Sequence, residues 1–347
     1  MKYLEETPWF ICDKEDTNYC AYVDTDSNYF NAEPILLHLV PNFEELSDEE
    51  KDSKLEKVAL AYQDIITDHY DQLAKECFNV KQFEWFDKPH WLEMKTECVI
   101  RSAYFRATRR YAQWITKQEG ISLKNHQTKK PKDNGIMGTD NGGQGEGDNF
   151  EEGILDIKGL EFMKANFPPI LGEFFNKILK QVLKGEEKDS IIQQIKDFKT
   201  KMLDGTIPLT KLGNPTAVKK LQKYSGQKPR AGELFTEILK GAPAPVRAAI
   251  RYNDLLKLWK LDKRYNLITM ADKVKWIYLK DNPYKIESLA FFDYEVPTKI
   301  SEFLEMYADR KKVFDSILLN KLEGFFNDLQ WELNLNPFIN AFDSFEV

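Results

Sequence analysis

The pattern of hydrophobic and polar positions predicts a hairpin and then a long helix near the start of the chain. Residues 18–30 (NYCAYVDTDSNYF) place aromatic and other strand-favouring residues on both sides of a polar centre, which is typical of a β-hairpin. Between 48 and 77, apolar residues recur at the spacing of one helix face: Leu55, Val58, Ala59, Tyr62, Ile65, Ile66 and Tyr70. Ser47 and Glu50 have the spacing of a capping box, so we expect an amphipathic helix to begin there.

Two further strands and an insert are expected next. TECVIRSAYF (96–105) and RRYAQWIT (109–116) have strand-like composition, and the pattern resumes in GILDIKGLEF (153–162). The segment between them is polar, and six of the chain's 17 glycines lie between Gly135 and Gly147. Such a segment cannot bury enough apolar surface to order itself, so we expect a disordered insert joining two strands of one sheet.

The second half of the chain is predicted to be mostly helical. Helical spacing covers about 170–184, 187–203, 232–240, 245–260 and 298–333, and the strand-like run VKWIYLK (274–280) interrupts it. The expected fold class is therefore α+β, with a mixed domain followed by a largely helical one. The expected divisions are 1–117, the insert 118–152, a closing strand 153–165, the helical domain 166–333 and a tail 334–347.

Composition narrows the class of protein. Apolar residues make up 42% and charged residues 30% of the chain, and no apolar run reaches the ~18 residues that a membrane span needs. The first ten residues carry acids where a signal peptide has its apolar stretch. The four cysteines lack CxxC spacing and the four histidines lack HExxH, which argues against a disulfide framework or a zinc site. We expect a cytoplasmic protein that does not associate with membranes.

The charge is unevenly distributed. The net charge is -7, yet residues 206–232 hold six Lys or Arg and no acid. Such a block can neutralise phosphates locally whatever the total charge, so we expect nucleic-acid contacts there.

Asp24 and Asp26 are the candidate catalytic and metal-binding residues. Two acids at a hairpin tip suit nucleotidyl transfer, in which two divalent ions roughly 3.5–4 Å apart clamp the attacking and leaving oxygens, and Mg²⁺ prefers carboxylate ligands. Period-2 alternation would send both side chains to one face. A solvated turn is the alternative, because Asp and Ser favour turns. The apolar flanks favour acids that project from a buried sheet.

The segment YVDTDS (22–27) resembles the YGDTDS signature of family B DNA polymerases, with Val23 in place of the usual glycine. That likeness implies that Asp24 and Asp26 lie at a palm active site. RATRRYAQW (106–114) is similar to the family's KKRYA stretch, which touches primer-terminus DNA, and Arg109 stands at its lysine position. A solvated basic turn is the alternative for this second segment.

Three later segments resemble the palm-to-thumb passage and the thumb of polymerases from large tailed phages. They are DIKGLEFMKANFPP (156–169), PVRAAIRYNDLLK (245–257) and LLNKLEGF (318–325). A structural ion pair between Glu161 and Lys164, and helix packing with solvated arginines, are the alternatives that we keep open. The basic block and the resemblance together predict contacts to primer-template DNA by Arg109, Arg110, Tyr111, Lys164, Lys219, Lys220, Lys223, Arg230, Arg247 and Arg251.

The resemblance also implies a sliding-clamp peptide at the end of the chain, with Phe342, Phe345 and Val347 as its anchors. Docking of these aromatic residues on the thumb is the alternative. The family's other palm aspartate motif, its fingers signature and its exonuclease acids have no counterpart here. We therefore expect a split polymerase: an N-terminal polymerase chain supplies those parts, and two Mg²⁺ ions and the dNTP bind in the completed site. A catalytically inactive DNA-binding clamp adaptor is the alternative, and we expect no polymerisation by this chain alone.

Overall fold

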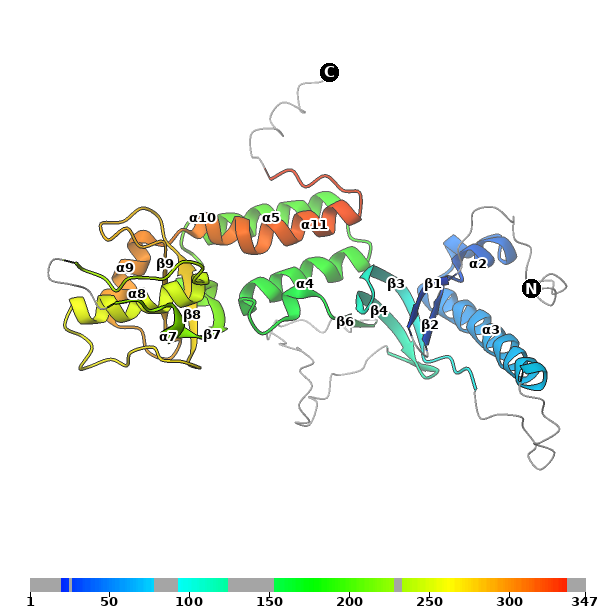
Figure 1. Ribbon diagram of the computed structural model, residues 1–347. Coiled ribbons are helices and arrows are strands. Elements are labelled where there is room, and N and C mark those ends of the chain that lie inside the picture. Colours follow the sequence, from blue (N-terminus) through cyan, green and yellow to red (C-terminus); the bar gives the residue numbers. More distant parts are fainter. Residues whose placement is uncertain (1–19, 25–26, 78–92, 124–152, 228–232, 336–347) are drawn as a thin grey trace, which may run out of the picture. The chain divides into compact units, whose positions relative to one another are not determined.

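A computed structural model describes residues 20–24, 27–77, 93–123, 153–227 and 233–335 (Figure 1). The chain divides into two compact units, Met1–Gly159 and Leu160–Val347. The boundary between them lies within 153–165, the segment that was expected to close the first domain. The α+β class is confirmed, because helices and antiparallel sheets occur together in the described residues.

Two antiparallel sheets and a long helix form the first unit. The expected hairpin is present, as are the three expected strands that follow the helix. The elements are β1 (Cys20–Asp24), β2 (Ser27–Phe30), α2 (Glu33–Leu39), the short 3-10 helix η1 (Phe43–Glu45), α3 (Asp48–Cys77), β3 (Cys98–Ala107), β4 (Arg110–Gln118), β5 (Ile121–Ser122) and β6 (Ile154–Lys158). β3 pairs with one edge of β4, while β5 and β6 pair with the other edge, so the insert does join two strands of one sheet.

The insert begins later than the sequence predicted. Gln118 still belongs to β4, and Ile121–Ser122 pair with it as β5. The polar composition suggested an earlier start of the insert. Instead, the chain turns back after β4, and the two residues of β5 form backbone hydrogen bonds with it. Residues 124–152 lie outside the described residues.

Helix α3 begins where its capping box predicts. The Ser47 backbone N–H donates to Glu50 Oε2 at 3.0 Å, and the Glu50 N–H donates back to Ser47 Oγ at 3.4 Å. Ion pairs hold the helix to the sheet: Arg101 of β3 binds the buried carboxylate of Asp52 at 3.0 Å. The early part of α3 is therefore held to β3 by ion pairs from Arg101 to Asp48 and Asp52.

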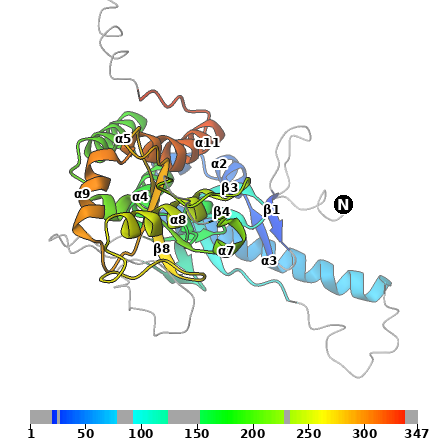
Figure 2. The same cartoon turned by 60° about the vertical axis from the view of Figure 1, so that its left-hand side comes forward.

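The second unit combines a helical group with a three-stranded sheet (Figures 1 and 2). Its elements are the 3-10 helix η3 (Glu161–Met163), α4 (Pro169–Leu183), α5 (Lys188–Leu203), α6 (Leu209–Leu212), β7 (Asn214–Ala217), α7 (Leu221–Tyr224), α8 (Ala244–Leu258), β8 (Lys273–Tyr278), β9 (Ser288–Phe291), α9 (Thr298–Tyr307), α10 (Arg310–Val313), the π-helical segment η4 (Phe314–Leu319) and α11 (Asn320–Asp328). Rings of Phe162, Phe175 and Phe325 join η3, α4 and α11, and α8 packs against the fully buried strand β9.

Two helix predictions in this unit are wrong. Residues 233–239 are not helical: Ile238 forms a bridge with Ser225, and Asp254 binds both the backbone N–H and the hydroxyl of Thr236. The predicted helix at 298–333 is interrupted at Ala308, which bridges to Leu279 beyond the end of β8. In both places, tertiary hydrogen bonds take the backbone groups that a helix would use. The strand predicted at 274–280 is present as β8. It is the central strand of a three-stranded sheet, whose flanking strands β7 and β9 were not predicted.

Candidate functional site

The backbone of the β1–β2 hairpin, which carries the candidate acids, is described as far as its strand pairing. In the β1–β2 register Asp24 lies opposite Ser27, and Tyr22 lies opposite Tyr29. The side chain of Asp24 and the whole of Asp26 lie outside the described residues, so the shared direction of the two carboxylates stays a prediction. The described part of the site is the way in which the hairpin docks.

Four aromatic rings attach this hairpin to the larger sheet. Tyr22 and Tyr29 meet Phe105 of β3 and Tyr111 of β4, and the ring centroids of all six pairs are 5.3 to 5.7 Å apart. Tilted and edge-on aromatic pairs contribute about 0.5–1.5 kcal/mol each beyond their burial. The cluster therefore fixes the strand that ends in Asp24 against the β3–β4 hairpin.

Two hydrogen bonds sharpen this attachment. The backbone N–H of Arg109 donates to Tyr22 Oη at 2.9 Å, and Tyr29 Oη donates to Tyr111 Oη at 3.1 Å. Burial, and then the hydrogen bond to Tyr111, raise the pKa of the Tyr29 phenol above its ordinary value. Tyr29 therefore stays protonated and keeps its donor role throughout the neutral range.

The basic turn is closed from its other side by a glycine. Arg109 lies in the β3–β4 turn with φ +58°, and Lys158 of β6 lies opposite Tyr111. Gly159 has φ +62°, and a Cβ there would come within 2.1 Å of the Arg109 carbonyl oxygen. Only glycine permits this approach. Tyr22, the stretch 109–111 and the stretch 158–159 thus meet at one turn.

Exposed cations surround this turn. The side chains of Arg109 and Arg110 are exposed, and that of Lys158 is 57% exposed and lies 3.8 Å from Asp156. Sequence reasoning gave no role to Lys158 or to the ring of Tyr22. Both lay inside the matched motifs, and the aromatic residues at alternating positions of the two hairpins were the available signal for the cluster.

Three of the predicted lysines of the second unit lie in one short stretch. Lys219 precedes α7, Lys220 is its N-cap residue with φ +57°, and Lys223 lies within it. All three are exposed, and none has an ion-pair partner among the described residues. Lys223 also lies 5.4 Å from the ring centroid of Tyr224. This stretch presents unneutralised positive charge to solvent.

Arg251 is occupied within the fold. Its guanidinium donates to Asp254 Oδ2 at 2.9 Å and to the carbonyl oxygen of Thr236 at 2.8 Å, and it lies over the ring of Phe235. Its side chain is 21% exposed. Helix packing, one of the alternatives weighed for this segment, accounts for these contacts.

The neighbours of Arg251 on α8 are also structural. Tyr252 is buried, and the Asn253 side chain both donates to and accepts from the backbone of Ile268, at 2.8 and 2.7 Å. Arg247 pairs with Glu287 at 3.4 Å and is 41% exposed, so part of its guanidinium still faces solvent.

Glu161 forms an ion pair with Lys321, not with Lys164. The matched segments at 156–169 and 318–325 therefore contact each other, and the alternative of a Glu161–Lys164 pair is wrong. The Lys164 side chain is exposed and has no ion-pair partner among the described residues. Arg230, Phe342, Phe345 and Val347 lie outside the described residues.

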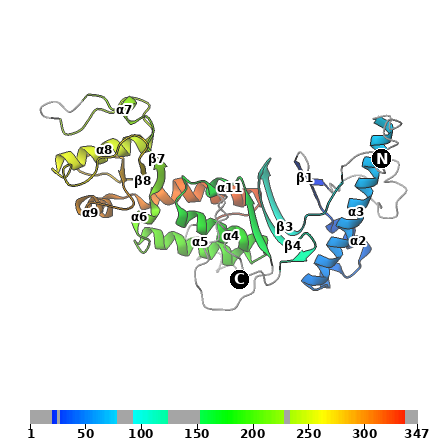
Figure 3. The ribbon, with the colours of Figure 1, turned by 90° about the horizontal axis from the view of Figure 1, so that it is seen from below.

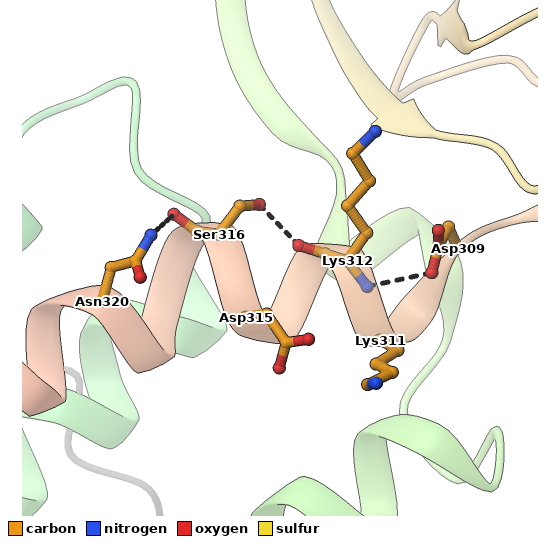
Figure 4. Close-up of a pocket in the computed structure, with 6 residues that line it drawn as sticks. All are labelled: Asp309, Lys311, Lys312, Asp315, Ser316 and Asn320. Atoms are coloured by element: carbon orange, nitrogen blue, oxygen red, sulfur yellow. Dashed lines mark hydrogen bonds between the residues drawn. The ribbon is translucent and has the colours of Figure 1, made fainter.

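A polar hollow of about 470 Å³ lies on α10 and η4 (Figure 4). It is lined by Asp309, Lys311, Lys312, Asp315, Ser316 and Asn320. Its polar groups largely bind one another: the Lys312 N–H donates to Asp309, the Ser316 hydroxyl to the Lys312 carbonyl, and the Asn320 amide to the Ser316 carbonyl. No residue of the candidate site lies in it.

The candidate acids are of the right type for Mg²⁺, because carboxylate oxygens are its preferred protein ligands. Within the described ranges, no group of three or more His, Cys, Asp or Glu is placed to hold a metal ion. No described helix is long and apolar enough to cross a membrane. No model of a known protein family matches the chain, and a search of curated proteins gives no match.

Proposed function

We propose that this chain is the C-terminal part of a family B DNA-directed DNA polymerase and adds nucleotides to a primer when a partner chain completes its palm. The observation that carries the proposal is the meeting of Tyr22 of the YVDTDS segment, the RRY turn and Lys158–Gly159, joined by the Tyr22–Arg109 hydrogen bond. The three segments resemble the family's motifs in their order along the sequence. Their contact in the fold is a separate observation, because a shared order along the sequence does not by itself bring segments together.

In this proposal Asp24 and Asp26, with a carboxylate from the partner chain, would hold two Mg²⁺ ions. Magnesium would supply the electrostatic clamp on the attacking and leaving oxygens. The chain's own contribution is position: the aromatic cluster fixes the β1–β2 hairpin, and the exposed Arg109 and Arg110 lie beside it to contact the end of the primer-template duplex.

The second unit would bind duplex DNA. Lys164, Lys219, Lys220 and Lys223 are exposed and lack ion-pair partners among the described residues, so phosphates could bind them without breaking an existing pair. Phe342, Phe345 and Val347 would recruit a sliding clamp. The partner chain would supply the exonuclease, the fingers, the dNTP site and the rest of the palm.

A two-chain reconstitution tests the catalytic part. The protein is combined with an N-terminal family B polymerase chain that carries the missing motifs, and primer extension is measured with Mg²⁺. Asp26→Ala should abolish extension while duplex affinity stays within about twofold, because a metal ligand contributes to chemistry more than to DNA binding. Asp262→Ala, at an exposed acid in the second unit, is the matched control and should extend normally. Unchanged extension by the Asp26 variant would remove the catalytic role.

A DNA-binding clamp adaptor without metal chemistry is the second candidate. The unpaired lysines beside α7 favour it, since phosphate binding needs no catalytic acid. The same substitution separates the two candidates: an adaptor raises the processivity of another polymerase equally well with and without the Asp26→Ala change.

A further inference from the structure

An apolar groove lies in the first unit between α2, α3 and the end of β2. It has a volume of about 210 Å³, and its lining includes Phe30, Leu36, Leu39, Lys54, Lys57 and Tyr62. Figures 1 and 3 show α2 beside the N-terminal part of α3. Phe30 stacks on Tyr62 with ring centroids 4.4 Å apart, and both rings line the groove.

The walls of this groove are incompletely covered. Leu36 is buried at its base, but Leu39 at its border is 45% exposed. α3 has 30 residues, yet among those with described burial only Asp52 and Ala74 are buried. The apolar stripe of α3 therefore has more surface than α2 covers, and removing that surface from water would be favourable.

Size and charge indicate the kind of occupant. Small-molecule sites usually enclose about 300–1,000 Å³, so this groove better fits one or two anchoring side chains of a protein segment. Its cations, Lys54 and Lys57, lie one turn apart on α3. Glu50, one turn before Lys54, accepts hydrogen bonds from Ser47, keeps its negative charge and attracts Lys54. Within the described part of the chain neither Lys54 nor Lys57 forms an ion pair, so two cations stand against this one acid. The border of the groove therefore attracts negative charge.

We propose that this groove receives an amphipathic helix of a partner protein, which inserts an aliphatic or aromatic anchor and places acidic side chains against Lys54 and Lys57. This is recognition of a helix in a groove, with apolar anchors for affinity and charge for orientation. The proposal rests on the groove alone. It extends the proposed function, because a two-chain polymerase needs such a contact.

The test uses the full chain and a fluorescently labelled model helix with leucines on one face and glutamates on the other. Anisotropy should show binding, and a counterpart with lysines in place of the glutamates should bind at least about tenfold more weakly. Leu39→Asp and the pair Lys54→Glu with Lys57→Glu should each weaken binding by a similar factor. Leu60→Asp is the matched control, since Leu60 is 46% exposed on α3 and does not line the groove.

Several results would overturn the proposal. They are absent binding, equal binding of the two helices, or binding that Leu39→Asp leaves unchanged. Self-association that Leu39→Asp abolishes, without helix binding, would identify a second copy as the occupant, and preference for anionic lipid vesicles over the acidic helix would identify a membrane surface. If the helix binds but the two-chain assay shows no primer extension, the groove remains a helix-binding site and only the proposed polymerase role is rejected.

Discussion

The backbone N–H of Arg109 donates to the phenol oxygen of Tyr22 at 2.9 Å, across 87 positions of the sequence. Tyr22 belongs to the strand that ends in Asp24, and Arg109 belongs to the exposed basic turn between β3 and β4. This contact, together with the Tyr29–Tyr111 hydrogen bond and the aromatic cluster, joins the strand that ends in Asp24 to the candidate DNA-contacting turn.

Tyr22→Phe should lower the free energy of unfolding by about 0.5–1.5 kcal/mol, because the Arg109 N–H loses its acceptor while the ring stacking is kept. Primer extension in the two-chain assay should fall as well, since the hairpin is then less firmly placed. Chemical denaturation measures the first effect. Tyr294→Phe, at a ring that is 72% exposed, is the control and should change neither quantity.

Gly159→Ala should destabilise the first unit strongly. Its Cβ would come within 2.1 Å of the Arg109 carbonyl oxygen, in addition to the strain of φ +62°. Gly185→Ala has φ +74° with open space around it, so it should show only the cost of a left-handed backbone, about 1–2 kcal/mol. Thermal unfolding of both variants separates the clash from the strain. Equal losses would mean that the β3–β4 turn moves to accept the methyl group.

Tyr29 should make stability fall at alkaline pH. Its pKa is raised in the folded state, so its contribution is fully present below the unfolded pKa of about 10 and is lost as pH rises toward the folded value. Tyr29→Phe should therefore lose less stability than the parent between neutral pH and pH values above about 10. Denaturant titrations at both ends of this window give the difference. A matching decline in both proteins would show that Tyr29 ionises normally.

Glu161 and Lys321 should show a modest coupling in a double-mutant cycle. Their side chains are 38% and 35% exposed, so solvent screening limits the coupling to about 0.2–1 kcal/mol. The single changes Glu161→Gln and Lys321→Met, with the double variant, are measured by denaturation. Lys164→Met combined with Glu161→Gln should be additive. Coupling in that second pair would contradict the arrangement described.

The lysines beside α7 should set the salt dependence of DNA binding. If Lys219, Lys220 and Lys223 each neutralise one phosphate, replacing all three by alanine should reduce the slope of log affinity against log salt by about 2.7, or about 0.9 per contact. Lys240, Lys257 and Lys263 are exposed lysines of the same unit, and their triple replacement is the control. If both triple variants change the slope alike, the attraction comes from net charge and not from a DNA-binding surface.

Local periodicity and capping were sufficient to predict the β1–β2 hairpin, α3 and the strands β3, β4 and β6 of the first unit, whereas α2, η1 and β5 were not predicted. The strands around Asp24, the helix begun by Ser47 and Glu50, and the pairing of strands across the insert follow from patterns within short windows. The same reasoning failed at 232–240. There, Asp254 and Arg251 bind the backbone and side chain of Thr236, and no pattern within the segment records that competition.

The sequence by itself determined which segments carry the candidate chemistry: the acids of the hairpin, the basic turn and the lysines near α7. Only the tertiary structure decided which of them meet. In the fold, Tyr22 bonds to the Arg109 turn, and Glu161 pairs with Lys321 while Lys164 stays exposed to solvent. Arg251 binds Asp254 within the fold. The physical reason is that a side chain's role depends on partners tens of residues away, whose distance is set by packing and not by sequence spacing.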